Sequence, residues 1–213
     1  MNVCVSIGDC SVEECIKSLQ DLELAEIRLD KINAKLSTDD VKNIFSQKLK
    51  LIATCRATKT LNDTERKNLL LSAIDAGAAY VDIEVEASDA YKNEILNKAK
   101  SKGCKIIISY HNYESTPKKG ELEQIVNWCL EAGDIAKIAC KVQSQHDNAR
   151  LLSLLDTDKK IIVIGMGEKG KITRIVAPLL GSPFTYASLK EGKETAEGQI
   201  SVDRLKELMR LLK

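Results

Sequence analysis

The feature that most constrains this chain is the regular alternation of short apolar runs with amphipathic stretches of helical length. Apolar and β-branched runs bounded by glycine or charged residues are typical of buried strands, and apolar residues spaced three and four apart are typical of helices. We predict strands at residues 2–6, 23–29, 50–55, 79–84, 104–110, 134–140, 160–165 and 183–187. We predict helices at residues 11–20, 38–46, 63–76, 89–102, 120–131, 144–155, 171–180 and 201–212.

Strands that alternate with helices and read as continuous apolar runs imply a parallel sheet covered by right-handed crossovers. A (β/α)8 TIM barrel and an open doubly wound sheet both fit this rule, and they differ in whether the first strand pairs with the last. Eight regular rounds favour the barrel. Because the sequence contains no internal repeat, low-complexity segment or linker, we expect residues 1–213 to form one barrel domain.

Glycines support the predicted ends of four helices. A glycine in the left-handed conformation commonly ends a helix. We expect this conformation at Gly77, Gly103, Gly133 and Gly181.

The composition excludes several classes of protein. A net charge of +1 gives no general attraction to nucleic acid or to an anionic membrane, so neither partner is expected. No apolar run approaches the roughly 18 residues of a membrane span, and the start of the chain lacks the features of a signal peptide. The seven cysteines are an odd number and form no Cys-x-x-Cys pair, which indicates reduced thiols and no zinc site. We therefore expect a cytoplasmic protein.

Polar side chains stand at the C-terminal ends of the predicted strands. In a strand, residues i and i+2 share a face, so these side chains should point together into the mouth of the barrel, where active sites of this fold lie. The residues are Ser6, Glu26, Arg28, Arg56, Asp82, Glu84, His111 and Lys137, with Met166 after the seventh strand. Any one of them could be structural, for example as an ion pair on the rim, but the whole set favours a site.

Lys137 lies in the stretch Gly133 to Cys140, where its neighbours from Ile135 to Cys140 are all apolar. Burial disfavours the charged form of lysine and lowers its pKa from about 10.4, and a neutral amine can attack a ketone or aldehyde to form an imine. The competing interpretation is a lysine whose stem covers apolar surface while its head reaches solvent.

Two other motifs are weaker. The segment Gly165 to Gly170 fits the G-x-G-x-x-G pattern of dinucleotide-binding loops, but it falls in the seventh round and no acidic residue ends the next strand. We therefore do not predict a nicotinamide or flavin site. His146 lies in the first turn of a predicted helix, where a surface or capping histidine is more common than a catalytic one.

The chain resembles the type I 3-dehydroquinate dehydratases, which are the Schiff-base enzymes of the shikimate pathway. The resemblance extends from the first strand to the last helix. It is carried by Glu26-Ile27-Arg28-Leu29-Asp30, Cys55-Arg56, Asp82-Ile83-Glu84, Ser109-Tyr110-His111-Asn112-Tyr113, Asp134-Ile135-Ala136-Lys137-Ile138-Ala139, Gly165-Met166-Gly167 through Thr173-Arg174, and Gly198-Gln199-Ile200-Ser201.

The resemblance implies dehydration of 3-dehydroquinate to 3-dehydroshikimate without a metal or other cofactor. Lys137 would form the imine, and His111, titrating near neutral pH, would transfer protons. The implied substrate contacts are Ser6, Glu26, Arg28, Arg56, Arg174, Thr195 and Gln199. Asp82, Glu84, Met166 and Tyr186 would support these residues, and the chain would form a homodimer.

The chain departs from the family pattern at several positions. It starts directly at its first strand, so we expect it to lack the N-terminal hairpin of longer members. Thr60 stands where many members have a glutamate that positions the histidine, which makes Glu84 our candidate for that role. Lys141-Val142 replaces a Met-Pro pair, and Glu197 replaces a proline in the last loop, where Thr195 stands for the usual serine.

Two alternatives remain open at this point. Another Schiff-base barrel, such as a sugar-phosphate aldolase, would need a phosphate site after the seventh and eighth strands, and the segment Gly165 to Gly170 could serve. A non-catalytic barrel that senses quinate-like molecules would be expected to lose Lys137 or His111, and both are present.

Overall fold

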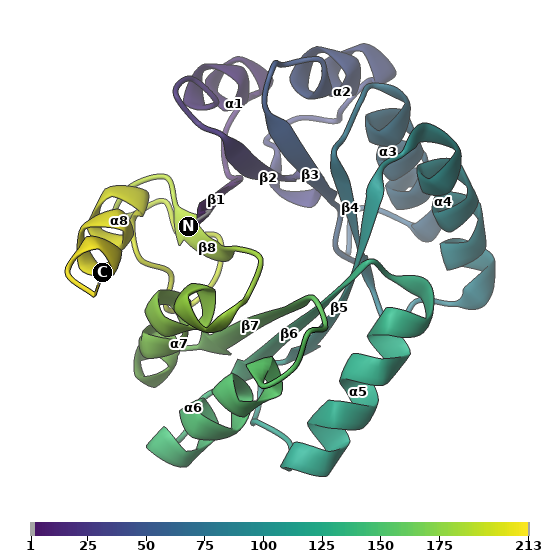
Figure 1. Ribbon diagram of the computed structural model, residues 1–213. Coiled ribbons are helices and arrows are strands. Elements are labelled where there is room, and N and C mark those ends of the chain that lie inside the picture. Colours follow the sequence, from purple (N-terminus) through teal and green to yellow (C-terminus); the bar gives the residue numbers. More distant parts are fainter. Residues whose placement is uncertain (1–2, 213) are drawn as a thin grey trace.

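The computed structural model describes residues 3–212, which form eight strands surrounded by eight α-helices (Figure 1). The strands are β1 (Val3–Ile7), β2 (Leu24–Arg28), β3 (Lys50–Thr54), β4 (Tyr80–Glu84), β5 (Lys105–Asn112), β6 (Ile135–Lys141), β7 (Ile161–Met166) and β8 (Thr185–Ser188). The helices are α1 (Val12–Ser18), α2 (Thr38–Phe45), α3 (Asp63–Asp75), α4 (Asp89–Lys102), α5 (Lys119–Ala132), α6 (Gln145–Leu152), α7 (Lys171–Val176) and α8 (Val202–Arg210). Short 3-10 turns add η1 (Leu29–Lys31), η2 (Ser153–Leu155), η3 (Glu168–Gly170) and η4 (Ala177–Leu180). All the predicted strands and helices are therefore present, except that Asn2, in the first predicted strand, lies outside the described residues.

The strands form one parallel sheet in the order β7-β6-β5-β4-β3-β2-β1-β8. The first strand pairs with the last, with Cys4 opposite Tyr186 and Ser6 opposite Ser188, which excludes the open doubly wound sheet. In residues 3–212 no hydrogen-bonded ladder joins β7 to β8, so the TIM barrel is nearly closed. No helix in this range is long and apolar enough to cross a membrane.

The predicted helix ends are correct at three of the four glycines. Gly77, Gly103 and Gly181 have positive φ angles of 103°, 69° and 106°. Gly133 does not, because its φ is −101°. A Cβ atom at this position would lie 2.8 Å from the side chain of Ile108 and from the carbonyl oxygen of Cys129, so this glycine permits close packing of α5 on β5.

The hydrophobic core has two layers because successive strand residues face opposite sides of the sheet. In β6, Ala136, Ile138 and Cys140 pack against the helices outside the barrel. Ile135 and Ala139 face the interior, where they join apolar residues of the other strands. The apolar members of this interior layer are Cys4, Leu24, Ile52, Ile107, Ile135, Ala139, Ile162, Ile164, Met166, Phe184 and Tyr186.

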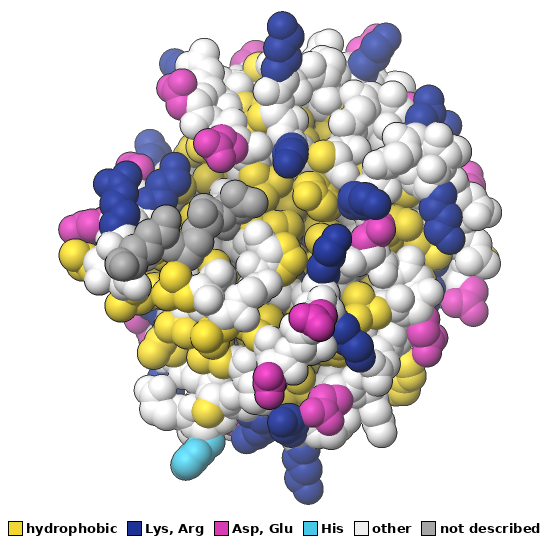
Figure 2. All heavy atoms as spheres, in the orientation of Figure 1, with side chains coloured by type: hydrophobic (Ala, Val, Ile, Leu, Met, Phe, Trp, Pro, Cys, Tyr) yellow, Lys and Arg dark blue, Asp and Glu magenta, His cyan; other side chains and the backbone are white. Residues whose placement is uncertain are grey.

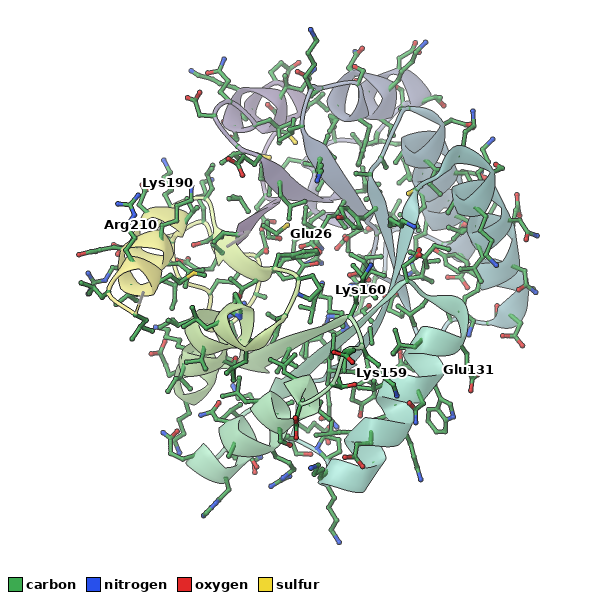
Figure 3. The ribbon with its side chains drawn as sticks, in the orientation of Figure 1. Glu26, Glu131, Lys159, Lys160, Lys190 and Arg210 are labelled. Atoms are coloured by element: carbon green, nitrogen blue, oxygen red, sulfur yellow. The ribbon has the colours of Figure 1, made fainter. Side chains whose placement is uncertain are left out.

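Polar residues of the strands lie at matching levels inside the barrel. The register places Ser6 beside Glu26 and Ser109 beside Lys137. Figure 3 shows Glu26 within the ring of strands, whereas Glu131 and Arg210 point outward from the helices. The parallel register therefore gathers the predicted site residues at one end of the barrel.

Candidate active site

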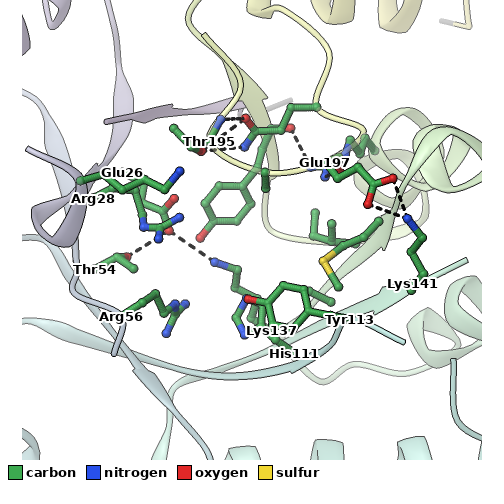
Figure 4. Close-up of a pocket in the computed structure, with 18 residues that line it drawn as sticks. Glu26, Arg28, Thr54, Arg56, His111, Tyr113, Lys137, Lys141, Thr195 and Glu197 are labelled. Atoms are coloured by element: carbon green, nitrogen blue, oxygen red, sulfur yellow. Dashed lines mark hydrogen bonds and ion pairs between the residues drawn. The ribbon is translucent and has the colours of Figure 1, made fainter. Parts of the chain in front are cut away.

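A cavity of about 300 Å³ opens at the C-terminal ends of the strands (Figure 4). It contains most of the residues predicted from the sequence, namely Glu26, Arg28, Arg56, His111, Lys137, Met166, Arg174, Tyr186, Thr195 and Gln199. Ser6, Asp82 and Glu84 do not line this cavity, but each contacts a residue that does. The predicted residues therefore form one cluster.

Lys137 is 6% exposed, so its head does not reach bulk solvent. Its Nζ atom lies 2.9 Å from Oδ2 of Asp82 and 3.4 Å from Oε1 of Glu26. It also lies 4.1 Å from the ring centroid of Tyr186. The strand around Lys137 is apolar, but two carboxylates and an aromatic face from other strands surround the head of the lysine and compensate its charge.

Asp82 pairs with two cations of the cluster. Its carboxylate accepts hydrogen bonds from Arg56 at 2.7 Å, from the hydroxyl of Ser109 at 2.6 Å and from Lys137. Burial alone would raise the pKa of Asp82, but the positive charges of Arg56 and Lys137 lower it well below its ordinary value. Asp82 is therefore ionised and fixes the position of the lysine.

Glu26 connects the lysine to the last loop of the barrel. Its carboxylate accepts hydrogen bonds from Ser6 at 2.6 Å and from Thr54 at 3.0 Å. Burial opposes ionisation of Glu26, yet Lys137 and Arg28 lower its pKa. The hydroxyl of Thr195 lies 2.7 Å from that of Ser6, so Ser6 lies behind Glu26 and Thr195.

Gln199 organises the loop that follows β8. Its side-chain carbonyl accepts a hydrogen bond from the backbone N–H of Thr195 at 2.8 Å, and its amide lies 3.2 Å from the Thr195 hydroxyl. Glu197 of the same loop forms an ion pair with Lys141 at the end of β6, with a shortest N–O distance of 2.5 Å. This loop therefore covers one side of the cavity.

His111 lines the cavity, and its ring stacks on that of Tyr113 with a centroid distance of 6.0 Å. Burial, together with the positive charges of Arg56 and Lys137, lowers the pKa of His111 well below its ordinary value. The expectation of a histidine that titrates near neutral pH is therefore wrong, since the ring is neutral at pH 7 and can accept a proton.

Glu84 does not position His111 by a hydrogen bond within residues 3–212. Its carboxylate instead lies 2.9 Å from Nη2 of Arg66 and 3.6 Å from Nη1 of Arg56. Arg66 is buried and also donates to the carbonyl oxygen of Cys55. Glu84 is therefore the carboxylate that pairs with Arg56 and Arg66. Its predicted role as the carboxylate that orients His111 is not supported.

Arg174 differs from the other cationic groups of the cavity. It is 1% exposed, and in the described part of the chain no carboxylate lies within 4.0 Å of it. Its guanidinium donates to the carbonyl oxygens of Tyr186 and Glu197, at 3.3 and 3.2 Å. Burial lowers the pKa of Arg174 to about 10, so it remains charged at neutral pH without a counter-ion. By contrast, Arg28 donates two hydrogen bonds to Asp30.

Sequence reasoning missed several residues that hold the cluster together. Thr54 and Ser109 stand two residues before Arg56 and His111, so the same-face rule could have found them. Arg66 belongs to the first turns of α3 and carries no strand signal. Arg66 could therefore not have been predicted by this rule.

The weaker motifs are explained without a cofactor. A Cβ atom at Gly170 would lie 2.4 Å from the backbone of Gly165, so these glycines permit close packing of the turn after β7. His146 lies on α6, and a histidine is visible there at the outer surface in Figure 2. Over residues 3–212, no group of three or more His, Cys, Asp or Glu side chains is arranged to hold a metal ion.

Comparison with known proteins places the chain among the dehydroquinases. Residues 3–213 match the family model described as Type I 3-dehydroquinase. The chain is 40% identical to a 3-dehydroquinate dehydratase of Methanocaldococcus jannaschii, with 99% of this chain and 98% of the relative covered. It is 33% identical to a 3-dehydroquinate dehydratase of Dehalococcoides mccartyi, with coverage of 98% and 94%.

Solved structures agree with this relationship. The 3-dehydroquinate dehydratase of Aquifex aeolicus superposes with a TM-score of 0.84 at 31% identity, covering 100% of this chain and 99% of that one. A 3-hexulose-6-phosphate synthase from Salmonella typhimurium covers both chains fully with a TM-score of 0.66, but at 13% identity it shows a shared fold alone. From the match over residues 3–213 and the relatives of similar length, the chain belongs to the type I 3-dehydroquinase family.

Proposed function

We propose that this cavity is where the chain dehydrates 3-dehydroquinate, with Lys137 as the imine-forming residue and His111 as the proton-transfer group. The activity is that of the family: a type I 3-dehydroquinate dehydratase removes water from 3-dehydroquinate to give 3-dehydroshikimate in the shikimate pathway. The observation that carries the assignment is that one cavity contains a buried lysine and a buried arginine, and that this arginine has no carboxylate partner among residues 3–212.

The substrate fits this pair chemically because it carries a ring ketone, hydroxyl groups and a carboxylate. Arg174 presents a desolvated guanidinium, which can hold a carboxylate through two parallel hydrogen bonds. Lys137 lines the same cavity and can reach the ketone. A single ligand could therefore place its ketone at Lys137 and its carboxylate at Arg174 at the same time.

The first half of the reaction forms the imine. His111, being neutral, accepts the proton that Lys137 must lose, and the free amine attacks the ketone carbon. His111 then returns this proton to the hydroxyl group of the tetrahedral adduct, which leaves as water, so that a protonated imine forms on Lys137 and His111 is neutral again. Asp82 and Glu26 lie beside Nζ, where their negative charges stabilise the iminium cation as they stabilise the ammonium.

The second half removes the substrate's own hydroxyl group. The iminium withdraws electrons, which makes a proton on the neighbouring carbon acidic. His111 takes this proton to leave an enamine, and then returns a proton to the departing hydroxyl as water leaves. Hydrolysis of the resulting imine releases the product and restores Lys137.

Other residues of the cavity orient the substrate. Glu26, Arg28 and Arg56 line the cavity near Lys137 and can bond to ring hydroxyls. Thr195 and Gln199 line it from the loop after β8 and can contact the part of the substrate near Arg174. In this proposal Ser6, which lies behind Glu26, and Asp82 and Glu84 support the contacting residues rather than meeting the substrate themselves.

An aldolase acting on sugar phosphates is less consistent with this site. A phosphate would need several backbone N–H groups that point into the cavity from the turn after β7, and the glycines there pack on each other. A sensing module would not need a neutral histidine beside a buried lysine. Both alternatives are tested by the same experiment.

The test is an activity assay that follows the conjugated enone of the product by its ultraviolet absorbance. The wild-type protein should convert 3-dehydroquinate, and Lys137→Ala should abolish conversion. Lys141→Ala is the matched control, because Lys141 lies on the same strand and lines the same cavity but pairs with Glu197. Loss of conversion in Lys141→Ala with retention in Lys137→Ala would refute the assignment.

The family resemblance also leads us to propose a homodimer that works in the cytoplasm. Seven free, buried cysteines support a reducing compartment. Exposed apolar side chains of α7 and η4, namely Ile172, Leu179 and Leu180, offer a surface for a second copy. Sedimentation equilibrium should give twice the monomer mass, and a monomer at micromolar concentration would contradict the dimer.

A further inference from the structure

The cavity contains buried polar atoms without a hydrogen-bond partner in the described residues. These atoms are Nη1 of Arg56, Nε of Arg174 and the hydroxyl of Tyr186, and all three residues line the cavity. Buried polar atoms are almost always hydrogen-bonded, because leaving one unpaired costs stability. Arg56 has a nearby carboxylate, and Arg174 is assigned to the substrate carboxylate. The hydroxyl of Tyr186 has no role in the scheme above.

Tyr186 contacts both residues that would hold the ends of the substrate. The face of its ring is 4.1 Å from Nζ of Lys137. Its backbone carbonyl accepts a hydrogen bond from Arg174 at 3.3 Å. Edge-on contact with Phe184, at a centroid distance of 5.6 Å, fixes the ring from below. Tyr186 therefore lines the same cavity as Lys137 and Arg174 and contacts both of them.

The packing of this residue does not require a hydroxyl. A phenylalanine would offer the same aromatic face to Lys137 and the same edge to Phe184. The hydroxyl adds only a desolvated polar atom to the free protein. Burial, reinforced by the negative charge of Glu26, raises the pKa of Tyr186 well above its ordinary value, so this atom is a hydrogen-bond donor at neutral pH.

We propose that the Tyr186 hydroxyl donates a hydrogen bond to an oxygen atom of the bound substrate, between the ketone held at Lys137 and the carboxylate held at Arg174. The inference rests on the site proposed above and adds a substrate-contacting residue to it. Tyr186 thereby acts in two ways, since its ring stabilises the cationic nitrogen of Lys137 and its hydroxyl fixes the substrate.

The test is Tyr186→Phe, which removes the hydroxyl alone. In the free protein this change removes an unpaired buried group, so the variant should unfold at the same temperature as wild type or higher. The KM for 3-dehydroquinate should rise about 2- to 12-fold, the factor for one hydrogen bond between uncharged groups, while kcat changes less. Tyr80→Phe is the matched control, because Tyr80 also contacts Phe184 edge-on within the barrel and does not line the cavity.

The outcomes separate this inference from the site assignment. An unchanged KM in Tyr186→Phe, or a lower unfolding temperature with loss of kcat instead of a raised KM, would overturn the role of the hydroxyl. An equal rise of KM in Tyr80→Phe would do the same. If the wild-type protein forms no covalent adduct at Lys137 with 3-dehydroquinate and borohydride, the proposed site itself fails, whatever Tyr186→Phe shows.

Discussion

Replacing Arg174 by methionine should separate substrate binding from folding more clearly than any other change in the cavity. Arg174 is buried and, in the described part of the chain, has no carboxylate partner until the substrate supplies one. Truncating one member of a buried, hydrogen-bonded charge pair costs about 2–5 kcal/mol. Since about 1.4 kcal/mol is a factor of ten, the KM should rise about 30- to 5000-fold.

The same change should have little effect on the free protein. Burial lowers the pKa of the guanidinium from 12.5 to about 10, which corresponds to an unfavourable contribution of about 3 kcal/mol to the folded state. The two hydrogen bonds to carbonyl oxygens offset this by about 0.5–1.5 kcal/mol each. Methionine restores part of the packing volume. The free energy of unfolding should therefore change by less than about 2 kcal/mol.

Two measurements check this prediction. The enone absorbance gives KM and kcat, and urea unfolding without substrate gives the free energy of unfolding. Lys31→Met is the control, because Lys31 also lines the cavity but pairs with Asp9 at the exposed rim, where a charge contributes little. Its KM should rise less than about 3-fold. An unchanged KM in Arg174→Met, or an equal rise in both variants, would refute the reasoning.

Four further predictions concern the proton-transfer group, the buried acid and metal ions. His111→Ala should still form an adduct with the substrate that is visible by intact mass, while turnover falls about 10²- to 10⁴-fold; near-normal turnover would assign proton transfer to another group. Because the pKa of His111 is lowered, kcat/KM should hold as the pH falls past about 6.5 and should decline only at lower pH; a decline centred near 6.5 would contradict a neutral ring. The lowered pKa of Asp82 contributes stability that is present above pH about 4 and is lost as the pH falls toward the folded-state pKa. In urea unfolding, the stability advantage of wild type over Asp82→Asn should therefore shrink below pH about 4, and a constant difference between the two proteins would contradict this prediction. Chelators should leave activity unchanged, since residues 3–212 contain no cluster with ligand geometry, and activity lost to a chelator and restored by metal would refute this.

The fold was predictable because its signals are local. Alternating strand and helix patterns determine the elements, and the two-residue period places Glu26, Asp82 and Lys137 inside the barrel. Closure could not be read from these local patterns alone, since the pairing of β1 with β8 depends on strand tilt and register. The role of Gly133 also depends on a distant residue. Glycine is needed at this position because Ile108 of β5 lies close to it, and not because the helix ends there in a left-handed conformation.

The site was predictable as a set of residues but not as a network. Many functional side chains stand in a strand or just after one, whereas Arg174 lies on α7 and Thr195 lies in the loop after β8. In every case the partner of the side chain depends on three-dimensional distance. Lys141 and Glu197 are 56 residues apart in the sequence and meet only through the loop after β8. Glu84 had several possible partners, and the position of Arg66 on α3 decided between them. The same is true of the electrostatics, because the neutral state of His111 follows from burial and from cations on neighbouring strands.

The central claim is that Lys137 forms the imine, and covalent trapping tests it most directly. Borohydride reduces an imine to a stable amine, so the protein treated with borohydride and 3-dehydroquinate should lose activity and gain one adduct. Peptide mass spectrometry should locate this adduct on Lys137, which faces the interior with Ile135 and Ala139, and not on Lys141 at the end of the strand. An adduct on Lys141, or full activity after treatment, would contradict the account.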